Sequence, residues 1–399
     1  AYVADELRAH DVAVHEGVAA TSITDNAGSP VVELADGTVI AADLVVLSVG
    51  VRPRSELAAS AGLAMTEAGA ILVDDQQRTS DPHIWAVGDA TASVHAVTGT
   101  VAPVALATPA NRGGRVAADS IAGRGRRSPR PLGTAIVRVF DLTVAMTGAS
   151  RRSLAGRAFH TARVHAGHHA GYFPGAETMH LLLHFDSDGR ILGAQGAGRA
   201  GIDKRIDVIA TAARGGLRAD DLVDLDLTYA PPFGSAKDPV MMLGMIADNV
   251  LSGRLHQHDP AEPLDPATTL VLDVRNPDEW AAGHVDGALL VPQPEVAAAI
   301  DTITQAAAGR PIAVHCASGF RSYLAHRTLA GAGIVSANVS GGFMTLSVLQ
   351  PQLLAHPQTS PASETTNGIT VSSTNAGKNA RPSGSTIATP TLAAASSSA

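Results

Sequence analysis

Residues 311–321 read PIAVHCASGFR and place a cysteine directly after a short apolar run. The apolar run predicts a buried strand, and the residues beyond Gly319 predict a helix. Gly319 allows the loop between them to curl, so that backbone N–H groups can turn inward. With a helix N-terminus behind it and Arg321 adding positive charge, the loop favours an anion such as the thiolate of Cys316. Cys316 is therefore a candidate nucleophile with an exposed thiol; the alternative is an inert buried cysteine.

The composition of the whole chain limits its function class. It has 399 residues, of which 45% are hydrophobic, 17% are charged and one is cysteine. The length predicts two to four domains. The net charge of −8 argues against a general nucleic-acid binder. One cysteine excludes an internal disulfide framework and a cysteine-cluster metal site, and it favours a reducing, cytoplasmic setting. The long uncharged stretches are broken by glycine and proline, so no membrane span is expected.

Four further motifs flank the cysteine loop. They are LDVR at 272–275, DEW at 278–280, GHVDGA at 283–288 and SGGF at 340–343. With the loop they resemble the rhodanese family over roughly 90 residues, about the size of a modest domain. The resemblance implies a sulfurtransferase in which Cys316 carries a persulfide. It also implies that Asp273, Arg275 and Glu279 support the structure rather than take part in catalysis.

The length of the loop distinguishes two chemistries that share this fold. Four residues separate Cys316 from Arg321, namely Ala317, Ser318, Gly319 and Phe320. Related phosphatases have one residue more, which makes a wider cradle for a tetrahedral phosphate. The shorter loop favours a single sulfur atom, so we expect sulfur transfer rather than phosphate-ester hydrolysis.

Residues 1–250 resemble the C-terminal part of the pyridine-nucleotide disulfide oxidoreductases, in the coenzyme A disulfide reductase branch that includes rhodanese fusions. The segment TSDPHIWAVGD at 79–89 is similar to that family's second flavin motif. The resemblance implies that Asp89, after Gly88, hydrogen-bonds a ribityl hydroxyl of FAD; the alternative is an aspartate that caps a turn. The segment VALATPAN at 104–111 resembles the helix that points its N-terminus at the flavin, which brings Ala107 and Thr108 to the cofactor.

Residues 132–250 resemble the dimerisation domain of the same branch. The motifs are HAGYFPG at 169–175 and YAPPFGSAKDP at 229–239. They imply a homodimer in which Tyr172 and Tyr229 reach across to the thiol substrate and the flavin; a plain core role is the alternative. Four histidines lie nearby, but no supporting carboxylate spacing accompanies them, so no metal is expected.

The sequence carries no G-x-G-x-x-G motif in the βαβ setting that FAD and NAD(P)H require. The literal match GAGRAG at 196–201 follows the second arm of an expected hairpin and falls within the region that resembles the dimerisation domain. We therefore expect the sequence to be a fragment of a longer protein or a truncated gene product. FAD and NAD(P)H are expected for the full-length parent, and FAD binding by this chain alone is expected to be weak or absent.

The expected fold is a multidomain α/β and α+β chain with a partial FAD/NAD-binding Rossmann-like region. Its expected domains are an NAD-domain remnant (1–56), the C-terminal part of an FAD domain (57–131), an α+β dimerisation domain (132–255), a rhodanese α/β domain (265–352) and a disordered Ser/Thr-rich tail (358–399). Within them we expect a hairpin with a type I′ turn at Asp36-Gly37, strands at 44–49, 70–73, 84–87, 270–274 and 312–315, a hairpin of 179–185 with 191–197, helices at 203–213 and 322–330, and linkers at 123–131 and 256–267.

The expected function is an FAD-dependent NAD(P)H:disulfide or persulfide oxidoreductase of the coenzyme A disulfide reductase type, fused to a rhodanese sulfurtransferase. Its substrates would be small thiols, disulfides or persulfides such as coenzyme A species. One alternative is a stand-alone rhodanese sulfur carrier that keeps a non-catalytic flavoprotein remnant for dimerisation. Another is a redox-sensing dimer without turnover. The natural sulfur donor and acceptor, and NADH against NADPH, cannot be read from the sequence.

Overall fold

The computed structural model describes residues 2–355, which all fall within one packed unit. The expected disordered tail, 358–399, lies outside the described residues. None of the helices in the described part is long and apolar enough to cross a bilayer.

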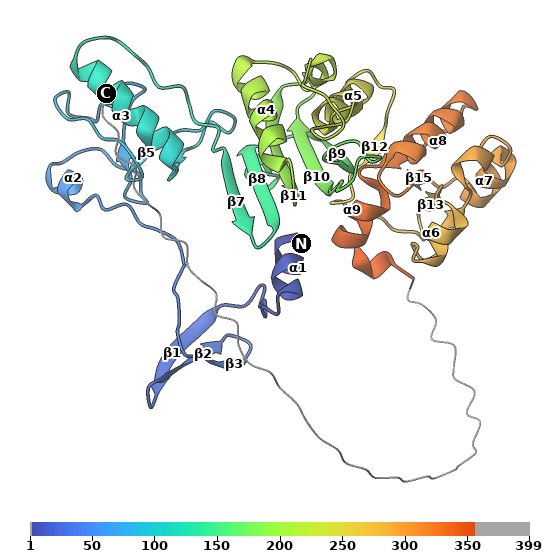
Figure 1. Cartoon of the computed structure of the whole chain (residues 1–399), viewed down its shortest axis with the longest axis horizontal. Helices are drawn as coiled ribbons and strands as arrows, with labels where there is room; N and C mark the ends of the chain where they lie inside the picture. The colour runs from blue at the N-terminus through green and yellow to red at the C-terminus, as the bar shows by residue number, and fades with distance from the viewer. Residues whose placement is uncertain (1, 356–399) are drawn as a thin grey trace, which may run out of the picture. The chain divides into compact units, whose positions relative to one another are not determined.

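A five-stranded antiparallel sheet, here called the central sheet, forms the middle of the chain (Figure 1). Its order is β7-β8-β11-β10-β9, with bounds β7 Ala135–Val139, β8 Leu142–Gly148, β9 His160–Gly167, β10 Thr178–Phe185 and β11 Ile191–Gly198. The expected hairpin is confirmed, because β10 and β11 pair antiparallel across a turn that contains Gly189.

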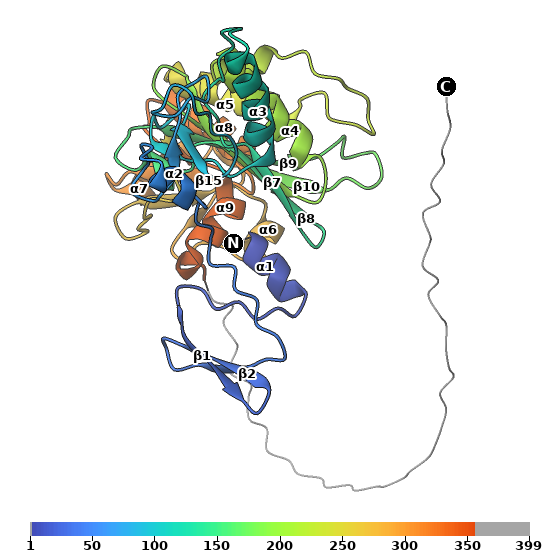
Figure 2. The same ribbon diagram turned by 90° about the vertical axis from the view of Figure 1, so that its left-hand side faces the viewer.

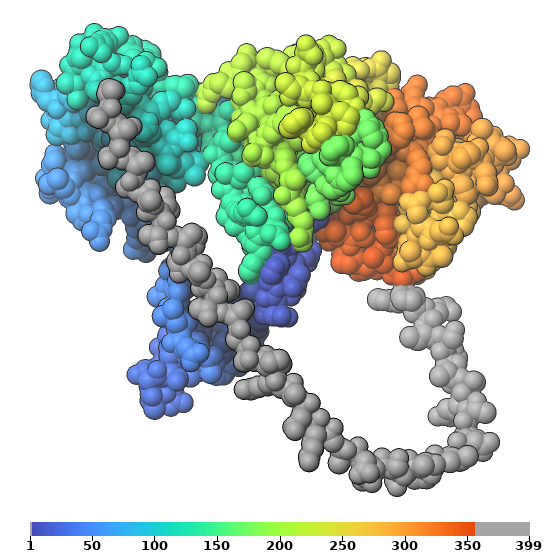
Figure 3. Space-filling model, viewed as in Figure 1, coloured from blue at the N-terminus to red at the C-terminus, as the bar shows by residue number. Residues whose placement is uncertain are grey.

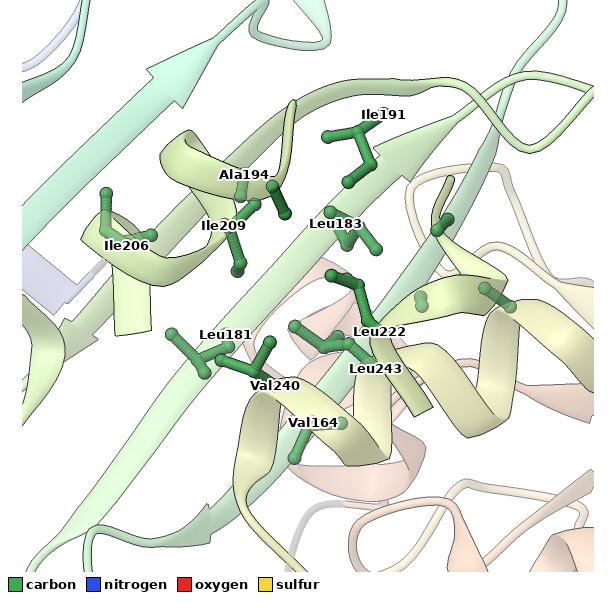
Figure 4. Packing of buried hydrophobic residues seen from close by; sticks show 14 of the residues in the cluster. Val164, Leu181, Leu183, Ile191, Ala194, Ile206, Ile209, Leu222, Val240 and Leu243 are labelled. Atoms are coloured by element: carbon green, nitrogen blue, oxygen red, sulfur yellow. The ribbon is translucent and has the colours of Figure 1, made fainter. Parts of the chain in front are cut away.

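Two helices cover one face of the central sheet and bury its core. They are α4 (Ile202–Gly215), close to the expected helix, and α5 (Pro239–Leu251). Figure 4 shows Ile209 of α4 beside Leu183 of β10, and Leu243 of α5 in the same cluster beside Leu222. The GAGRAG glycines serve this packing: a Cβ at Gly196 would lie 2.8 Å from Leu181. This supports the interpretation that the motif is not a nucleotide loop.

The second large sheet is parallel and contains the cysteine strand. Its order is β12-β16-β15-β13-β14, with bounds β12 Gln257–His258, β13 Leu270–Asp273, β14 Leu289–Leu290, β15 Ile312–His315 and β16 Ala337–Val339. Alternate residues enter two different cores, since Ile312 and Val314 belong to one cluster and Ala313 to another. The continuous apolar runs predicted for 270–274 and 312–315 therefore have cover on both faces.

Helices surround this parallel sheet on both faces. Their bounds are α6 Pro277–Ala281, α7 Ile300–Ala307, α8 Phe320–Gly331 and α9 Gly342–Leu349. Residues of α7 and α8 join the core that holds Ile312, whereas Leu346 of α9 joins the core that holds Ala313. The expected helix at 322–330 is confirmed as part of α8. Residues 256–267 are more than a linker, because Gln257 and His258 pair with β16.

The first hundred residues form short elements. They are α1 Tyr2–Ala9, β1 Ala20–Asn26, β2 Ser29–Leu34, β3 Val39–Ala41, α2 Glu56–Ser60, β4 Ile71–Leu72, β5 Thr91–Val94 and β6 Val101–Pro103, followed by α3 Ala107–Ile121. Helix α1 packs against β7 and β8 (Figure 2). Most side chains of β1–β3 are exposed, and the blue residues of this sheet are open to solvent in Figure 3.

Three expectations for this region are wrong in part. The hairpin β2–β3 is present, but Asp36 does not have a positive φ, so the turn at Asp36-Gly37 is not type I′. The two consecutive positive φ angles of a type I′ turn occur instead at Ala27-Gly28, between β1 and β2.

The other two corrections concern strands. Residues 44–49 form no strand, and Leu44 and Val49 are 77% and 90% exposed, because no described strand pairs with them. Residues 84–87 make only an isolated bridge at Trp85. Both runs have strand-like composition without a neighbouring strand to complete a ladder.

A buried ion pair ties the loops of the central sheet together. Arg205 of α4 is 1% exposed and donates to the Asp238 carboxylate at 2.9 Å and to the His168 carbonyl at 2.8 Å. Asp238 also caps α5 by accepting from the Val240 amide. Removing the arginine would leave a buried carboxylate without its counter-charge.

We expect Arg205→Met to destabilise the central sheet by about 3–5 kcal/mol, the usual cost of breaking a buried ion pair. Hydrogen exchange of β10 and β11 amides, followed by mass spectrometry, should accelerate by roughly 100-fold or more. The exposed Asp207→Ala on the same helix is the control, with an expected change within about 0.5 kcal/mol. Unchanged exchange in Arg205→Met would contradict this role.

Candidate active site

Cys316 lies directly after β15, at the carboxyl end of the parallel sheet and before α8. Its sulfur accepts hydrogen bonds from the Gly319 amide at 3.2 Å and from the Ser322 hydroxyl at 3.4 Å. Donors around a sulfur atom favour its anionic form over the thiol. The expectation of an exposed thiol is wrong: Cys316 is 1% exposed, because it belongs to the core that also holds Ile312 and Val314.

The N-terminus of α9 holds the cysteine loop from behind. The amides of Phe343 and Met344 donate to the carbonyls of Cys316 (2.7 Å) and Ala317 (3.0 Å). Because a trans peptide points its N–H opposite to its C=O, these bonds turn the following amides away from α9. This orientation is the physical basis for a loop whose N–H groups gather on one side, as the sequence predicted.

Close approach explains the glycine that begins α9. Gly342 has φ +60°, and a Cβ there would lie 2.4 Å from the Cys316 carbonyl oxygen and 2.8 Å from that of Ala317. A side chain at this position would push α9 off the loop. The SGGF motif and the cysteine loop are therefore one structural unit.

Arg321 is held by an acidic partner. Its guanidinium donates to both oxygens of Glu279, each at 2.7 Å, in a bidentate pair. The hydrogen bonds from Arg321 lower the pKa of Glu279 to about 2, and the carboxylate in turn raises the pKa of Arg321. Glu279 thus fixes the position of Arg321 and balances part of its charge, which the sequence interpretation did not anticipate.

A second, fully buried pair lies beneath the loop. Asp273 accepts from the side chain of Arg275 at 2.6 and 2.9 Å, and Arg275 also donates to the Gly283 carbonyl at 2.8 Å. The Arg275 guanidinium lies 3.9 Å from the centre of the Phe343 ring. These contacts join the LDVR, GHVDGA and SGGF motifs into one support.

The segment that lies behind the cysteine loop, from Ser340 to Thr345, also contacts the central sheet. The Ser340 hydroxyl donates to the Thr161 carbonyl at 3.0 Å, and Nε2 of His165 lies 2.7 Å from the Thr345 hydroxyl. Burial lowers the pKa of His165 to about 4, so this histidine is neutral near pH 7. Its Nδ1 lies 2.6 Å from Nδ1 of His180. Among the described residues, no group of three or more His, Cys, Asp or Glu side chains could hold a metal ion.

Three of the four expected cofactor residues line two adjoining pockets at the N-terminus of α3. Gly88 lines one of about 310 Å³, and Ala107 and Thr108 line the other of about 620 Å³. Asp89 is exposed but lines neither pocket. Arg112 lines both, and its buried Nε has no hydrogen-bond partner among the described residues.

The two expected substrate tyrosines meet on the surface. Their hydroxyl oxygens are 3.2 Å apart, and Tyr172 and Tyr229 are 77% and 49% exposed. The hydrogen bond to Tyr229 raises the pKa of Tyr172. Within one chain the motifs that carry them are therefore neighbours, and the pair presents its rings to solvent.

The sequence interpretation missed several residues around the cysteine. Ser322 could have been found, because it is six residues past Cys316, on the first turn of α8. No local sequence pattern could have indicated the contacts of His165, Arg163 and Asn338, because these contacts depend on how the central sheet packs against the cysteine loop. Only the structure brings them to one place.

Two family models match this chain. One describes the pyridine nucleotide-disulphide oxidoreductases and matches residues 1–110, and the other describes the rhodanese-like domain and matches residues 257–347. The coenzyme A disulfide reductase of Staphylococcus haemolyticus is 36% identical over 204 residues, which are 51% of this chain and 46% of that protein.

Solved structures resemble the chain over most of its length. The reduced CoADR-RHD of Bacillus anthracis has a TM-score of 0.84 and 38% identity, covering 89% of this chain and 64% of that one. The NAD-dependent persulfide reductase of A. fulgidus has a TM-score of 0.77 and 34% identity, covering 86% and 63%. The chain thus spans less than two thirds of each of these relatives. It joins a pyridine nucleotide-disulphide oxidoreductase region to a rhodanese domain, in a CoADR-RHD-like arrangement.

Proposed function

We propose that Cys316 carries sulfur as a persulfide and that the chain is the sulfur-transferring part of a coenzyme A disulfide or persulfide reductase. The observation that supports this most is the immobilised cysteine loop. Its carbonyls are bound by α9, and its sulfur accepts from Gly319 and Ser322. A loop built in this way stabilises one anionic sulfur atom.

The transfer needs no external oxidant. The Cys316 thiolate attacks the outer sulfur of a donor such as thiosulfate, a new S–S bond forms, and the donor's bond to that sulfur breaks to release sulfite. An acceptor thiolate then attacks the outer sulfur of the Cys316 persulfide. The acceptor leaves as a persulfide, and the bonding electrons return to Cys316 as thiolate.

The proposal gives a role to each residue of the persulfide loop. Arg321 is catalytic, and the loop itself consists of Ala317, Ser318, Gly319 and Phe320. Gly319 supplies an amide to the sulfur, and Phe320 stands at the rim of the loop with 61% of its side chain exposed. Arg321 places a positive charge near the sulfur while Glu279 limits its movement. The substrate class is small thiols, disulfides and persulfides, including coenzyme A species.

The hydrogen-bond donors at the pockets near α3 fit the flavin that the oxidoreductase family uses. Ala107 and Thr108 begin a helix, so their N–H groups have no intrahelical acceptor, and Arg112 lines both pockets with its positive charge. Such donors suit an electron-rich ring edge. FAD, when bound, would accept hydride from NAD(P)H and pass electrons to a disulfide. Asp89 and Gly88 would hold its ribityl chain; weak or absent FAD binding by this chain stays a prediction.

The homodimer with Tyr172 and Tyr229 at the substrate also stays a prediction. The second candidate function is a stand-alone rhodanese sulfur carrier that keeps a non-catalytic flavoprotein remnant for dimerisation.

Replacing Cys316 by Ser should abolish sulfur transfer from thiosulfate to cyanide, with a loss of roughly 1,000-fold or more, because a hydroxyl cannot form the persulfide. Thiocyanate formation is the measurement. Asp301→Asn, at an exposed carboxylate of α7, should keep native activity. Residual turnover in Cys316→Ser would contradict the proposal.

Glu279→Gln should move the pH profile of thiosulfate-dependent loading of Cys316 to lower pH. The folded pKa of Glu279 is lowered to about 2, so its bond to Arg321 is complete above the usual carboxyl range and is lost only as pH falls toward 2. Between pH 5 and 9 the native carboxylate thus offsets the guanidinium. Its removal should stabilise the thiolate and shift the midpoint by about 0.2–0.7 pH units.

The neighbouring Asp278→Asn is the matched control for this shift. It removes the same charge from an exposed carboxylate one residue earlier, which does not contact Arg321. Its profile should overlay that of the native protein. An equal shift in both variants, or none in Glu279→Gln, would show that the pair does not control the charge on the sulfur.

A further inference from the structure

A side chain of the central sheet, His165 of β9, is bonded to the helix behind the cysteine loop. Its Nε2 lies 2.7 Å from the hydroxyl of Thr345, in the first turn of α9. Thr345 is 7% exposed, so little water competes for this contact. The bond therefore joins the central sheet to the helix whose N-terminal amides bind the carbonyls of the cysteine loop.

The central sheet holds the second nitrogen of the same ring. Nδ1 of His165 lies 2.6 Å from Nδ1 of His180, which is directly opposite on β10. At this distance only one of the two facing nitrogens carries a hydrogen, so one ring donates to the other. The His180 ring in turn stacks on Tyr2 of α1, with ring centres 4.3 Å apart. Both nitrogens of His165 are thus engaged, and its ring has one orientation toward α9.

The turn that begins α9 carries this contact to the sulfur loop. A Cβ at Gly341 would lie 3.1 Å from Nε2 of His165, so the ring also packs against this turn. The same turn borders the loop, because a Cβ at Gly319 would lie 3.6 Å from the Gly341 amide nitrogen. Gly319 is the residue whose amide donates to the Cys316 sulfur at 3.2 Å. A displacement of the turn would therefore weaken a hydrogen bond that stabilises the thiolate.

The contact between His165 and α9 involves no charged group near neutral pH. Burial lowers the pKa of His165 to about 4, and His180 and Arg163 lower it further. On the α9 side the ring faces Gly341 and Thr345, which do not titrate. A neutral amide in place of the ring would thus leave the local charges unchanged between about pH 6 and 9. The charged or titratable groups around the ring are His180 of β10, Arg163 of β9 with its partner Asp259, and Lys237 before α5.

We propose that His165 is a positioning residue for sulfur transfer: by binding Thr345 it fixes α9, and through α9 it aligns the loop amides around the Cys316 sulfur. The inference rests on the proposed sulfur transfer by Cys316. Thr345 and Cys316 lie within the segment that matches the rhodanese-like domain, 257–347, whereas His165 lies outside both matched segments. A residue of the central sheet thus completes the sulfur site of this chain.

The test is the pH profile of thiosulfate-dependent loading of Cys316 in the full chain, read as a gain of roughly 32 Da for one sulfur atom. The midpoint of this profile reports how well the loop stabilises the thiolate, and a lower stability of a folded protein does not by itself move it. His165→Asn can keep the contact of Nδ1 but does not reach Thr345. It should move the midpoint to higher pH by about 0.5 units or more, because misaligned amides stabilise the anion less.

Further variants separate positioning from simple destabilisation. Thr345→Val removes the hydroxyl, keeps the shape of the side chain and should give the same shift. His165→Gln places an amide near the position of Nε2 and should return the midpoint to within about 0.2 units of the native value. Combining His165→Asn with Thr345→Val should give no larger shift than either change alone, because both remove the same bond.

His184→Gln is the matched control. His184 is four residues from His180 on β10, so the two share a face of the sheet. Burial lowers the pKa of His184 to about 4, and its Nδ1 lies 3.0 Å from the Thr161 hydroxyl of β9. The variant removes a neutral, buried histidine whose hydrogen bond lies within the central sheet, and its midpoint should stay native.

The outcomes separate the two proposals. An unchanged midpoint in His165→Asn and Thr345→Val, additive shifts in the double variant, or no recovery in His165→Gln would overturn the positioning role alone. If His165→Asn does not fold, Thr345→Val decides by the same criterion. An equal shift in His184→Gln would assign the effect to the sheet as a whole and would also overturn the role. Absence of loading in the native chain would overturn the sulfur transfer on which the role rests.

Discussion

The cysteine loop depends on two hydrogen bonds from the N-terminus of α9. By binding the carbonyls of Cys316 and Ala317, the amides of Phe343 and Met344 fix the orientation of two successive peptide planes. Helix N-terminal amides have no intrahelical acceptor, so the helix gains as much from this contact as the loop does. The glycine at 342 makes the approach possible, and the buried Asp273–Arg275 pair holds the surrounding motifs in register.

Much of the parallel domain could be predicted because its signals are local. A continuous apolar strand, a cysteine and a glycine before a helix define the unit at 311–331, and the structure reproduces each part. The hairpin β10–β11 and helix α4 were also predicted, from alternation and from a glycine stop. These elements obey short-range rules, so the sequence suffices.

The remainder depended on contacts between distant segments. The run at 44–49 has the composition of a buried strand, but a strand needs partners, and the described residues provide none. The burial of Cys316 follows from its place in a core built from several separate segments, and the pairing of Arg321 with Glu279 joins residues 42 positions apart. No local sequence pattern encodes contacts between segments that lie so far apart in the chain. The roles of Asp89, Ala107, Thr108 and the two tyrosines rest on resemblance and are still predictions.

The central claim is that α9 shapes the loop that carries sulfur, and Gly342→Ala tests it most directly. The Cβ would lie 2.4 Å from the Cys316 carbonyl oxygen, at a backbone φ of +60°. Peptide mass mapping after thiosulfate treatment should show a gain of roughly 32 Da at Cys316 in the native chain. The account predicts loss of this gain in Gly342→Ala and its retention in Gly331→Ala, where a Cβ meets nothing within 4 Å. Equal gains in Gly342→Ala and the native chain would contradict it.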